Sequence, residues 1–524
     1  MLRSPPMTEP DDRFTLPDPR MASIAWYWDS MHTPRPLPPL VGDAHRARIE
    51  GISGRPAAIV NGYGYMGLGP PTTPVFALEQ SPETDPATAW REFYLPRIRA
   101  IWGRTQAADY GAMSAAALAD ELPRIVRDSA VGFAYTMAPL MAISAPMTTL
   151  MEFCGRHFGA DGDLRAMTML SGFENTTTGT GEGLGRLAEL GAELPAVAST
   201  LASGRFEAIQ GVEGGPRFME ALRVYLADFG AASETWFGFH TPTWSEDPVR
   251  PLQMIANYVR NPASNPLRAH ERAARVREET VRETLAALPA GGDRERLRGI
   301  LAAAHDYVSV FEERARWQIM LSASLRTPSL ALGEKLRAGS VLGSQEDIFF
   351  FQLSELPGLV RGALDGQAIA AERRAAFARW ERLTPPATLG APLPGGFQRA
   401  PMVVKMFGFR GEPGPVEDVG LLKGAAASRG LARGVARVVT ELDDSDRLAD
   451  GEVLVCRFTA PPWTPLFSIA AAVVTDAGGV LSHAAIAARE YAIPCVTGTG
   501  DATQRIPDGT LIEVDGGAGT VRIL

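Results

Sequence analysis

One stretch near the C-terminus, residues 471–496, constrains the fold of this 524-residue chain more than any other part of it. It opens on the apolar run 471–474, which predicts a strand buried on both faces because it leaves no polar side. Two glycines, Gly478 and Gly479, then predict a flexible turn, and Ser482 stands where a helix N-cap is expected. The helix is predicted to run from about residue 483 to residue 491. Such a strand–turn–helix unit is typical of an α/β domain.

His483 is the first residue of the predicted helix, and the glycines before it leave its ring uncovered. A helix N-terminus carries free N–H groups and about half a positive charge, so a phosphate held there is stabilised. The sequence therefore predicts an anion on His483. The alternative is an ordinary capped helix with an exposed histidine.

Four short motifs in this stretch carry a family resemblance: Gly478-Gly479, Ser482-His483, Ala488-Arg489-Glu490 and Ile493-Pro494. In this order they closely resemble the phosphohistidine swivelling domain of the PEP-utilising phosphotransferases, which include phosphoenolpyruvate synthase, pyruvate phosphate dikinase and rifampicin phosphotransferase. The resemblance covers residues 421–524 and implies that His483 is phosphorylated. It assigns a phosphohistidine loop to Thr475, Gly478, Gly479, Ser482 and Arg489. One departure is Arg429, where the family usually has the proline of a Ser-Pro-Gly motif.

Composition narrows the remaining classes of function. A hydrophobic fraction of 45% and a charged fraction of 21% are ordinary for a globular protein of several domains. The net charge of -9, without a basic patch interleaved with aromatic residues, argues against nucleic acid as a partner. The three cysteines, Cys154, Cys456 and Cys495, are too far apart to indicate a disulfide framework or a metal site. We therefore predict a cytoplasmic protein without a metal of its own.

Two segments bear on targeting. Residues 1–20 are rich in Pro, Asp and Arg and lack an apolar core, so we predict a disordered tail and no signal peptide. Residues 129–151 carry no charge and are long enough to span a bilayer. They contain Pro139 and Pro146 and several small polar residues, which favours buried or kinked helices over a membrane span.

The expected fold class is an α-rich, multi-helix acceptor-binding domain followed by a C-terminal α/β swivelling phosphohistidine domain. Residues 21–383 form the acceptor domain, with a helical pattern from about residue 87 to residue 380. Residues 384–420 are rich in Pro and Gly. We predict that they form a tether, because a carrier domain that visits two sites needs one. The alternative is an irregular segment wrapped on the surface.

A proline-rich segment with several aromatic residues, 25–40, opens the acceptor domain. Extended chain of this kind exposes its side chains without needing ladder hydrogen bonds, which suits a pocket wall. The alternative is a surface arm whose aromatic residues anchor it to the core. Its aromatic-Asp-x-x-His-x-Pro-x-Pro pattern is similar to the opening element of the acceptor domain in the same family, and Asp29 or His32 is the candidate base. Candidate substrate-binding residues in and near this element are Trp26, Trp28, Arg35, Tyr63 and Tyr65.

A second departure from the family lies at residues 230–233, where Gly-Ala-Ala-Ser stands in place of the Gly-His-Arg-Gly of many relatives. A histidine and an arginine that could manage a charged acceptor are missing, so we expect a neutral, rather apolar acceptor. Trp236 is a candidate for the wall of its pocket, although it could equally pack a core. Arg314 and Arg316 are candidates for contacts with the phosphoryl oxygens.

Two parts of larger family members are not recognisable in the sequence: an ATP-grasp nucleotide domain and a barrel domain for phosphoenolpyruvate. The arrangement resembles two-component phenylphosphate synthases and related alkylphenol-phosphorylating systems. It implies that a separate ATP-grasp subunit uses ATP and Mg²⁺ to phosphorylate His483, and that the phosphate then passes to the hydroxyl of a small, phenolic substrate. The alternatives are a rifampicin-type antibiotic phosphotransferase component and a non-catalytic phosphocarrier or regulatory subunit.

Overall fold

The computed structural model describes residues 13–30, 32–71, 75–173, 176–233, 237–394, 420–440, 442–459 and 461–524. Residues 1–12 of the predicted tail and residues 395–419 of the predicted tether lie outside this part of the chain. The chain divides into two compact units. The first unit comprises residues 1–139, 235–241 and 317–395, and the second comprises 140–234, 242–316 and 396–524. The predicted acceptor domain, 21–383, thus contributes to both units.

A small antiparallel sheet lies in the first unit, with the strand order β2-β3-β1-β4. Its strands are β1 (Ala25–Trp28), β2 (Ala57–Val60), β3 (Tyr63–Gly67) and β4 (Thr388–Gly390). The turn between β2 and β3 is Asn61-Gly62, and both residues have positive φ, of 48° and 77°. Asn-Gly is the pair that a tight hairpin turn of this kind favours. The hairpin thereby places β3 beside β1, whose C-terminal end leads into Asp29 and His32.

The helices of the first unit are α1 (Pro39–Ser53), α2 (Pro86–Thr88), α3 (Leu95–Ala107), α4 (Ala115–Met137), α13 (Arg326–Ala338), α14 (Leu356–Val360) and α15 (Gly366–Trp380). Of these, α1, α4, α13, α14 and α15 share an apolar core, to which Leu40, Leu122 and Leu332 contribute. Ser114 begins α4 by accepting the Ala117 N–H at 3.2 Å, the N-cap interaction that satisfies a free helix donor. The small sheet has a separate apolar cluster, which includes Trp26, Tyr63 and Tyr65.

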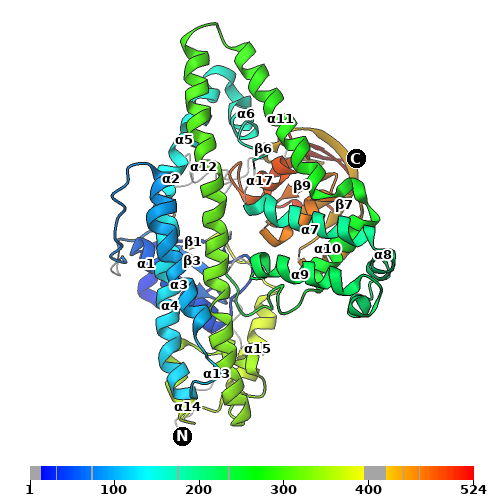
Figure 1. Ribbon diagram of the computed structural model, residues 1–524. Coiled ribbons are helices and arrows are strands. Elements are labelled where there is room, and N and C mark those ends of the chain that lie inside the picture. The colour runs from blue at the N-terminus through cyan, green and yellow to red at the C-terminus, as the bar shows by residue number, and fades with distance from the viewer. Residues whose placement is uncertain are drawn as a thin grey trace. The chain divides into compact units, whose positions relative to one another are not determined.

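The helices of the second unit are α5 (Leu140–Phe158), α6 (Gly162–Thr168), α7 (Thr176–Glu193), α8 (Pro195–Ala202), α9 (Gly215–Phe229), α10 (Val249–Arg260), α11 (Pro266–Ala287) and most of α12 (Gly292–Ala323) (Figure 1). The uncharged stretch 129–151 is divided between α4 and α5. No helix in the described ranges is both long and apolar enough to cross a membrane. Residues 179–185, a glycine-rich run, lie within α7.

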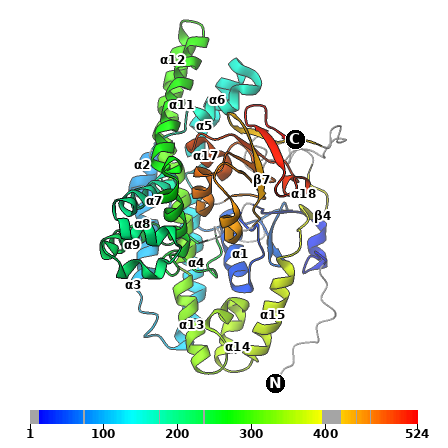
Figure 2. The same ribbon diagram turned by 90° about the vertical axis from the view of Figure 1, so that its right-hand side faces the viewer.

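An eight-stranded sheet forms the C-terminal part of the second unit, in the order β5-β12-β11-β7-β8-β9-β10-β6. The strands are β5 (Leu421–Lys423), β6 (Ala425–Ser428), β7 (Leu431–Val438), β8 (Val453–Cys456), β9 (Ala472–Thr475), β10 (Cys495–Thr497), β11 (Leu511–Asp515) and β12 (Thr520–Ile523). Strands β7 to β10 run parallel, and the pairs outside them are antiparallel. With α17 (His483–Glu490) and α18 (Ala502–Arg505), this confirms the predicted fold class of a helical region followed by an α/β domain. Strand β7 and the helices α17 and α18 are labelled in Figure 2.

Candidate functional site

The strand–turn–helix unit that carries His483 forms as the sequence predicts. Strand β9 ends at Thr475, whose hydroxyl donates to the Ala477 carbonyl at 2.7 Å and fixes the turn. Gly478 has φ +104°, and a Cβ at this position would lie 2.8 Å from the Cβ of Ser482. The turn therefore requires glycine at 478, both for its backbone conformation and for space.

Ser482 occupies the N-cap position of α17, but its side chain does not cap the helix. Its hydroxyl is buried and has no hydrogen-bond partner in the described part of the chain. The hydroxyl packs towards Gly478 rather than the first helical N–H groups, so the predicted cap is wrong in its side-chain contact. The helix itself spans His483–Glu490 and leaves its first N–H groups available beside His483.

Two threonine hydroxyls hold the ring of His483. Thr459, which follows β8, lies with Oγ1 3.0 Å from Nδ1. Thr464, in the short helix η10 (Pro461–Ser468), lies with Oγ1 3.2 Å from Nε2. The residue keeps some exposed surface, yet burial lowers the pKa of His483 to about 3. The imidazole is therefore neutral at pH 7, the form with a lone pair on one nitrogen.

Arg489 and Glu490 at the end of α17 contact other parts of the second unit. The Arg489 guanidinium donates from Nη1 to the Ala427 carbonyl of β6 at 2.8 Å, and burial lowers its pKa to about 10. The Glu490 carboxylate accepts the Gly172 N–H at 2.9 Å, in the segment after α6. Burial, with a smaller contribution from Glu312, raises the pKa of Glu490 to about 8. Both side chains thus fix the position of α17.

Two further contacts join the α/β domain to the helices of the second unit. Arg429 forms an ion pair with Asp161, at the start of α6. Tyr258 of α10 donates its hydroxyl to the Pro465 carbonyl of η10 at 3.2 Å. Arg429 stands where the family resemblance expects a proline, so this departure supplies a charged contact in the docked carrier.

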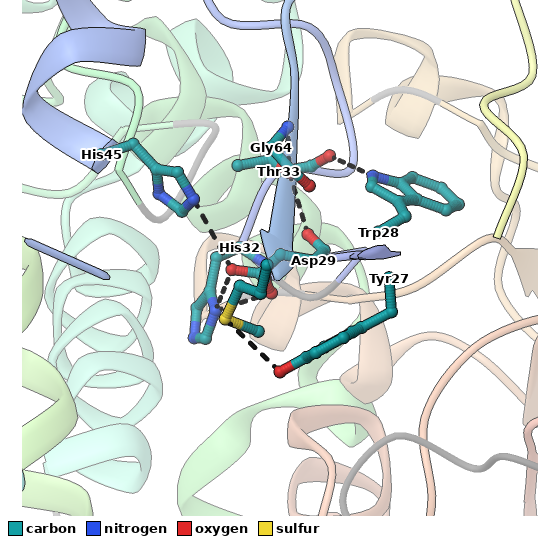
Figure 3. Close-up of polar contacts among 8 residues, drawn as sticks. Tyr27, Trp28, Asp29, His32, Thr33, His45 and Gly64 are labelled. Atoms are coloured by element: carbon teal, nitrogen blue, oxygen red, sulfur yellow. Dashed lines mark hydrogen bonds and ion pairs between the residues drawn. The ribbon is translucent and has the colours of Figure 1, made fainter. Parts of the chain in front are cut away.

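A second candidate site lies in the first unit, where Asp29 follows β1. The Asp29 carboxylate is fully buried, and each of its oxygens lies 2.9 Å from Nδ1 of His32. Oδ2 also lies 3.7 Å from Nε2 of His45, on α1 (Figure 3). The backbone here is held by Thr33, whose hydroxyl donates to the Asp29 carbonyl at 2.9 Å and accepts the Gly64 N–H at 3.0 Å. One carboxylate therefore orients two imidazoles.

The electrostatics of this group favour a charged Asp29. Burial by itself raises the pKa of Asp29, but its interactions with His32 and, to a smaller extent, with His45 outweigh burial and leave the pKa below its usual value. Burial lowers the pKa of His45 to about 4, so His45 is neutral at pH 7. Sequence reasoning missed His45, because nothing in the local pattern of α1 distinguishes it from a core histidine.

Most aromatic candidates of the opening segment anchor backbone rather than line a pocket. Trp26 is fully buried and donates Nε1 to the Met21 carbonyl at 2.8 Å, while Trp28 donates Nε1 to the Thr33 carbonyl at 2.9 Å. Tyr63 donates its hydroxyl to the Trp380 carbonyl at 3.0 Å, and Tyr65 donates to the Pro386 carbonyl at 2.9 Å. These contacts match the alternative of aromatic residues that anchor the segment to the core.

The candidate arginines lie in separate places. Arg35 lies near His240. Burial lowers the pKa of His240 to about 3, and the charge of Arg35 contributes to this shift. Arg314 and Arg316 lie on α12 within the second unit, where Arg314 stacks on Phe311 and Arg316 donates to the Asp228 carbonyl at 2.7 Å. Trp236 lies outside the described residues. No group of three metal-ligating side chains occurs within the described ranges.

Comparison with known proteins places two family domains on the chain. Residues 448–519 match the PEP-utilising enzyme mobile domain, and residues 135–312 match the rifampicin phosphotransferase fourth domain. The first match contains His483 and both threonines that contact it. The resemblance to PEP-utilising phosphotransferases is therefore confirmed.

Three curated relatives are similar over much of the chain. The chondramide synthase of Chondromyces crocatus is 31% identical over 83% of this chain, which covers 12% of that protein. An uncharacterized phosphotransferase of Bacillus subtilis is 31% identical over 61% of this chain and 38% of its own length. A rifampicin phosphotransferase of Streptomyces sviceus is 32% identical over 60% of this chain and 35% of its own length. The chain thus spans well under half the length of these relatives.

Proposed function

We propose that this chain, which carries the mobile domain of PEP-utilising enzymes, accepts a phosphoryl group on His483 and transfers it to the hydroxyl of a small, phenolic acceptor. The donor is ATP with Mg²⁺, bound by a separate ATP-grasp partner, in the cytoplasm. The observation that carries this proposal is the neutral imidazole of His483 at the start of α17, held between Thr459 and Thr464.

The first step is attack by His483 on the donor's phosphorus. A neutral imidazole has one N–H and one lone pair, so one threonine accepts a hydrogen bond from it and the other donates. The nitrogen with the lone pair forms the N–P bond while the bond from phosphorus to the donor oxygen breaks. The threonine hydroxyl at that nitrogen must turn away, and the free N–H groups of α17 then stabilise the negative charge.

The second step is attack by the acceptor hydroxyl on the phosphohistidine. The O–P bond forms as the N–P bond breaks, and His483 returns to its neutral form. We assign His32 as the base that takes the hydroxyl proton and Asp29 as the group that orients it, since both Asp29 oxygens hold Nδ1 of His32. A phenol, with a pKa near 10 as in tyrosine, needs only modest help with deprotonation.

An aromatic acceptor is supported by the surroundings of His32. The ring of Phe237 lies 5.1 Å from the His32 ring and 5.3 Å from the ring of Phe133, centre to centre. Both phenyl rings are buried, so they make the inner side of His32 apolar, which suits a neutral aromatic acceptor better than a charged one. Positioning of the acceptor then supplies most of the catalysis in phosphoryl transfer.

The test uses the predicted ATP-grasp partner and ATP labelled at the transferred phosphate. We expect acid-labile label on the wild type and on the control His157→Ala, and none on His483→Ala. Label that persists on His483→Ala would contradict the carrier role. With labelled protein in hand, His32→Ala should retain the label and fail to pass it to phenol, and unimpaired transfer would remove His32 from the mechanism.

A rifampicin-type acceptor is the second candidate. It is favoured by the match of residues 135–312 to the rifampicin phosphotransferase fourth domain and by the relative of that name. A panel of phenols, alkylphenols and rifampicin separates the two, because only the true class should discharge the phosphoprotein. Discharge by none of them, with transfer to another protein, would indicate the phosphocarrier alternative.

A further inference from the structure

Helix α1 carries a second buried polar residue beside His45. Arg48 lies one turn further along, and the two residues are 1% and 2% exposed. The Arg48 guanidinium stacks on the ring of Phe237, with Cζ 4.9 Å from the ring centre. The rings of His32 and His45 lie 5.1 and 6.3 Å from the same centre. The candidate base His32, the neutral imidazole of His45 and the guanidinium of Arg48 therefore all pack around the Phe237 ring.

The charge of Arg48 is poorly satisfied. Nη2 donates to the Ser322 hydroxyl at 3.1 Å, and that hydroxyl in turn donates to the Phe237 carbonyl at 3.0 Å. Nη1 is buried and has no hydrogen-bond partner in the described part of the chain, and no carboxylate there pairs with Arg48. Burial lowers the pKa of Arg48 to about 9, which still leaves it protonated at pH 7.

An arginine held in this way costs free energy, because a buried charge without a counter-ion loses its hydration without compensation. Arg326, in the same unit, shows how a buried arginine is usually compensated by hydrogen-bond acceptors and a nearby carboxylate. It is also buried, but it donates to the Phe239 and His240 carbonyls at 3.3 and 2.8 Å and has Glu346 at 4.0 Å. The contrast indicates that Arg48 is kept for a ligand that supplies negative charge.

His45 adds an acceptor to this donor. Its Nε2 faces the Asp29 carboxylate, so the proton of the neutral ring belongs on Nε2 and Nδ1 holds the lone pair. Nδ1 is likewise buried and without a partner in the described residues. A phosphoryl group protonated on one oxygen presents both an anionic oxygen for Arg48 and an O–H for His45.

We propose that Arg48 and His45 form the receptor for the phosphoryl group in the acceptor unit, with Nη1 of Arg48 on an anionic oxygen and Nδ1 of His45 on a P–OH. This inference rests on the proposed function, since it assigns the site at which the transferred phosphate is held. The side chain of His32 is 21% exposed and marks the accessible edge of the group. Arg48 is then a catalytic residue, because it contacts the group in transfer.

Inorganic phosphate, added without any donor, tests the receptor directly. We expect phosphate to raise the melting temperature of the wild type and of Arg326→Met, and to have no effect on Arg48→Met. Without phosphate, Arg48→Met should melt at the wild-type temperature or above, because it removes an unpaired buried charge, whereas Arg326→Met should melt lower. A phosphate response that Arg48→Met retains would overturn the proposal.

The catalytic consequence is measured with phosphorylated protein. Arg48→Met should accept phosphate on His483 at the wild-type rate and transfer it to phenol about 10²–10³-fold more slowly, the usual loss for one preorganised donor. Transfer by Arg48→Met within a factor of three of the wild type would overturn the assignment. Arg48→Lys, which keeps the charge but not the planar fork, is the second variant and should show a smaller loss of both phosphate response and transfer. Failure of His483 labelling in the wild type would instead refute the proposed function, and the phosphate response would stand apart from it.

Discussion

Glu490 offers a quantitative test of how the carrier domain is held in the second unit. The residue is 4% exposed, and its carboxyl accepts the Gly172 N–H and is repelled by the charge of Glu312. Burial is the main cause that raises its pKa from 4.5 to about 8, and Arg489 and Arg277 only partly offset it. The folded protein therefore carries Glu490 mainly in the protonated form at pH 7, and Glu490→Gln reproduces the shape of that form without its titration.

The sign of the effect follows from proton binding. Between pH 4.5 and 8 the unfolded chain has lost this proton and the folded chain keeps it, so the free energy of unfolding falls as the pH rises. Each pH unit across this window is worth about 1.4 kcal/mol, which gives a limit of about 5 kcal/mol above pH 8. Glu490→Gln should remove this loss. It should match the wild type near pH 5 and exceed its unfolding free energy by several kcal/mol at pH 9.

Urea unfolding of both proteins from pH 5 to pH 9 measures the difference. Glu452→Gln is the matched control in the same α/β domain, because Glu452 accepts from Arg437 and this hydrogen bond lowers its pKa. Its substitution should cost stability above pH 4.5, the opposite sign. A Glu490→Gln effect of equal size at pH 5 and pH 9 would refute the buried, protonated carboxyl and with it this description of the docked carrier.

Three further changes have defined outcomes. Asp29→Asn should slow transfer from the phosphoprotein to phenol about 10²–10⁴-fold, because His32 loses the carboxylate that orients it, and should leave His483 labelling unchanged in a single-turnover assay. Gly478→Ala should lower the unfolding free energy by about 1–3 kcal/mol and slow labelling, since its φ is +104° and its Cβ meets Ser482; calorimetry that detects no loss would contradict this. His45 is neutral when folded, so wild-type stability should fall as the pH drops from 6.5 towards 4, by about 3 kcal/mol at most. His45→Gln should flatten that slope in urea titrations at each pH, and an unchanged slope would contradict it.

The carrier domain could be predicted from sequence because its signals are local. Strands β8 and β9 are buried throughout and lie between parallel neighbours, so they appear in the sequence as unbroken apolar runs. The turn after β9 is also encoded locally, by Gly478, and so is the short helix α17 that follows it. The side-chain contact of Ser482 was not predictable, because it depends on how closely Gly478 approaches.

The candidate acceptor site was predicted only in part. The spacing of Asp29 and His32 places them in one turn of chain, and the structure joins them. His45 and Arg48 reach the same group through the packing of α1 against Phe237, which no local pattern encodes. The partner of Arg429, Asp161, is likewise 268 residues away in sequence. The sequence alone therefore could not predict the ion pair that Arg429 forms in place of the family's proline.

The most direct test follows one phosphate from carrier to acceptor. Purified protein phosphorylated on His483 is mixed with phenol, and phosphate on the His483 peptide and phosphate on phenol are both quantified over time by mass spectrometry. If transfer runs through His483, phosphate on the His483 peptide should fall at the rate at which phosphate on phenol rises, and the two amounts should be equal. Phosphate that stays on His483, or leaves it only to water while phenol is present, would contradict the proposal that this chain transfers phosphate to a phenol.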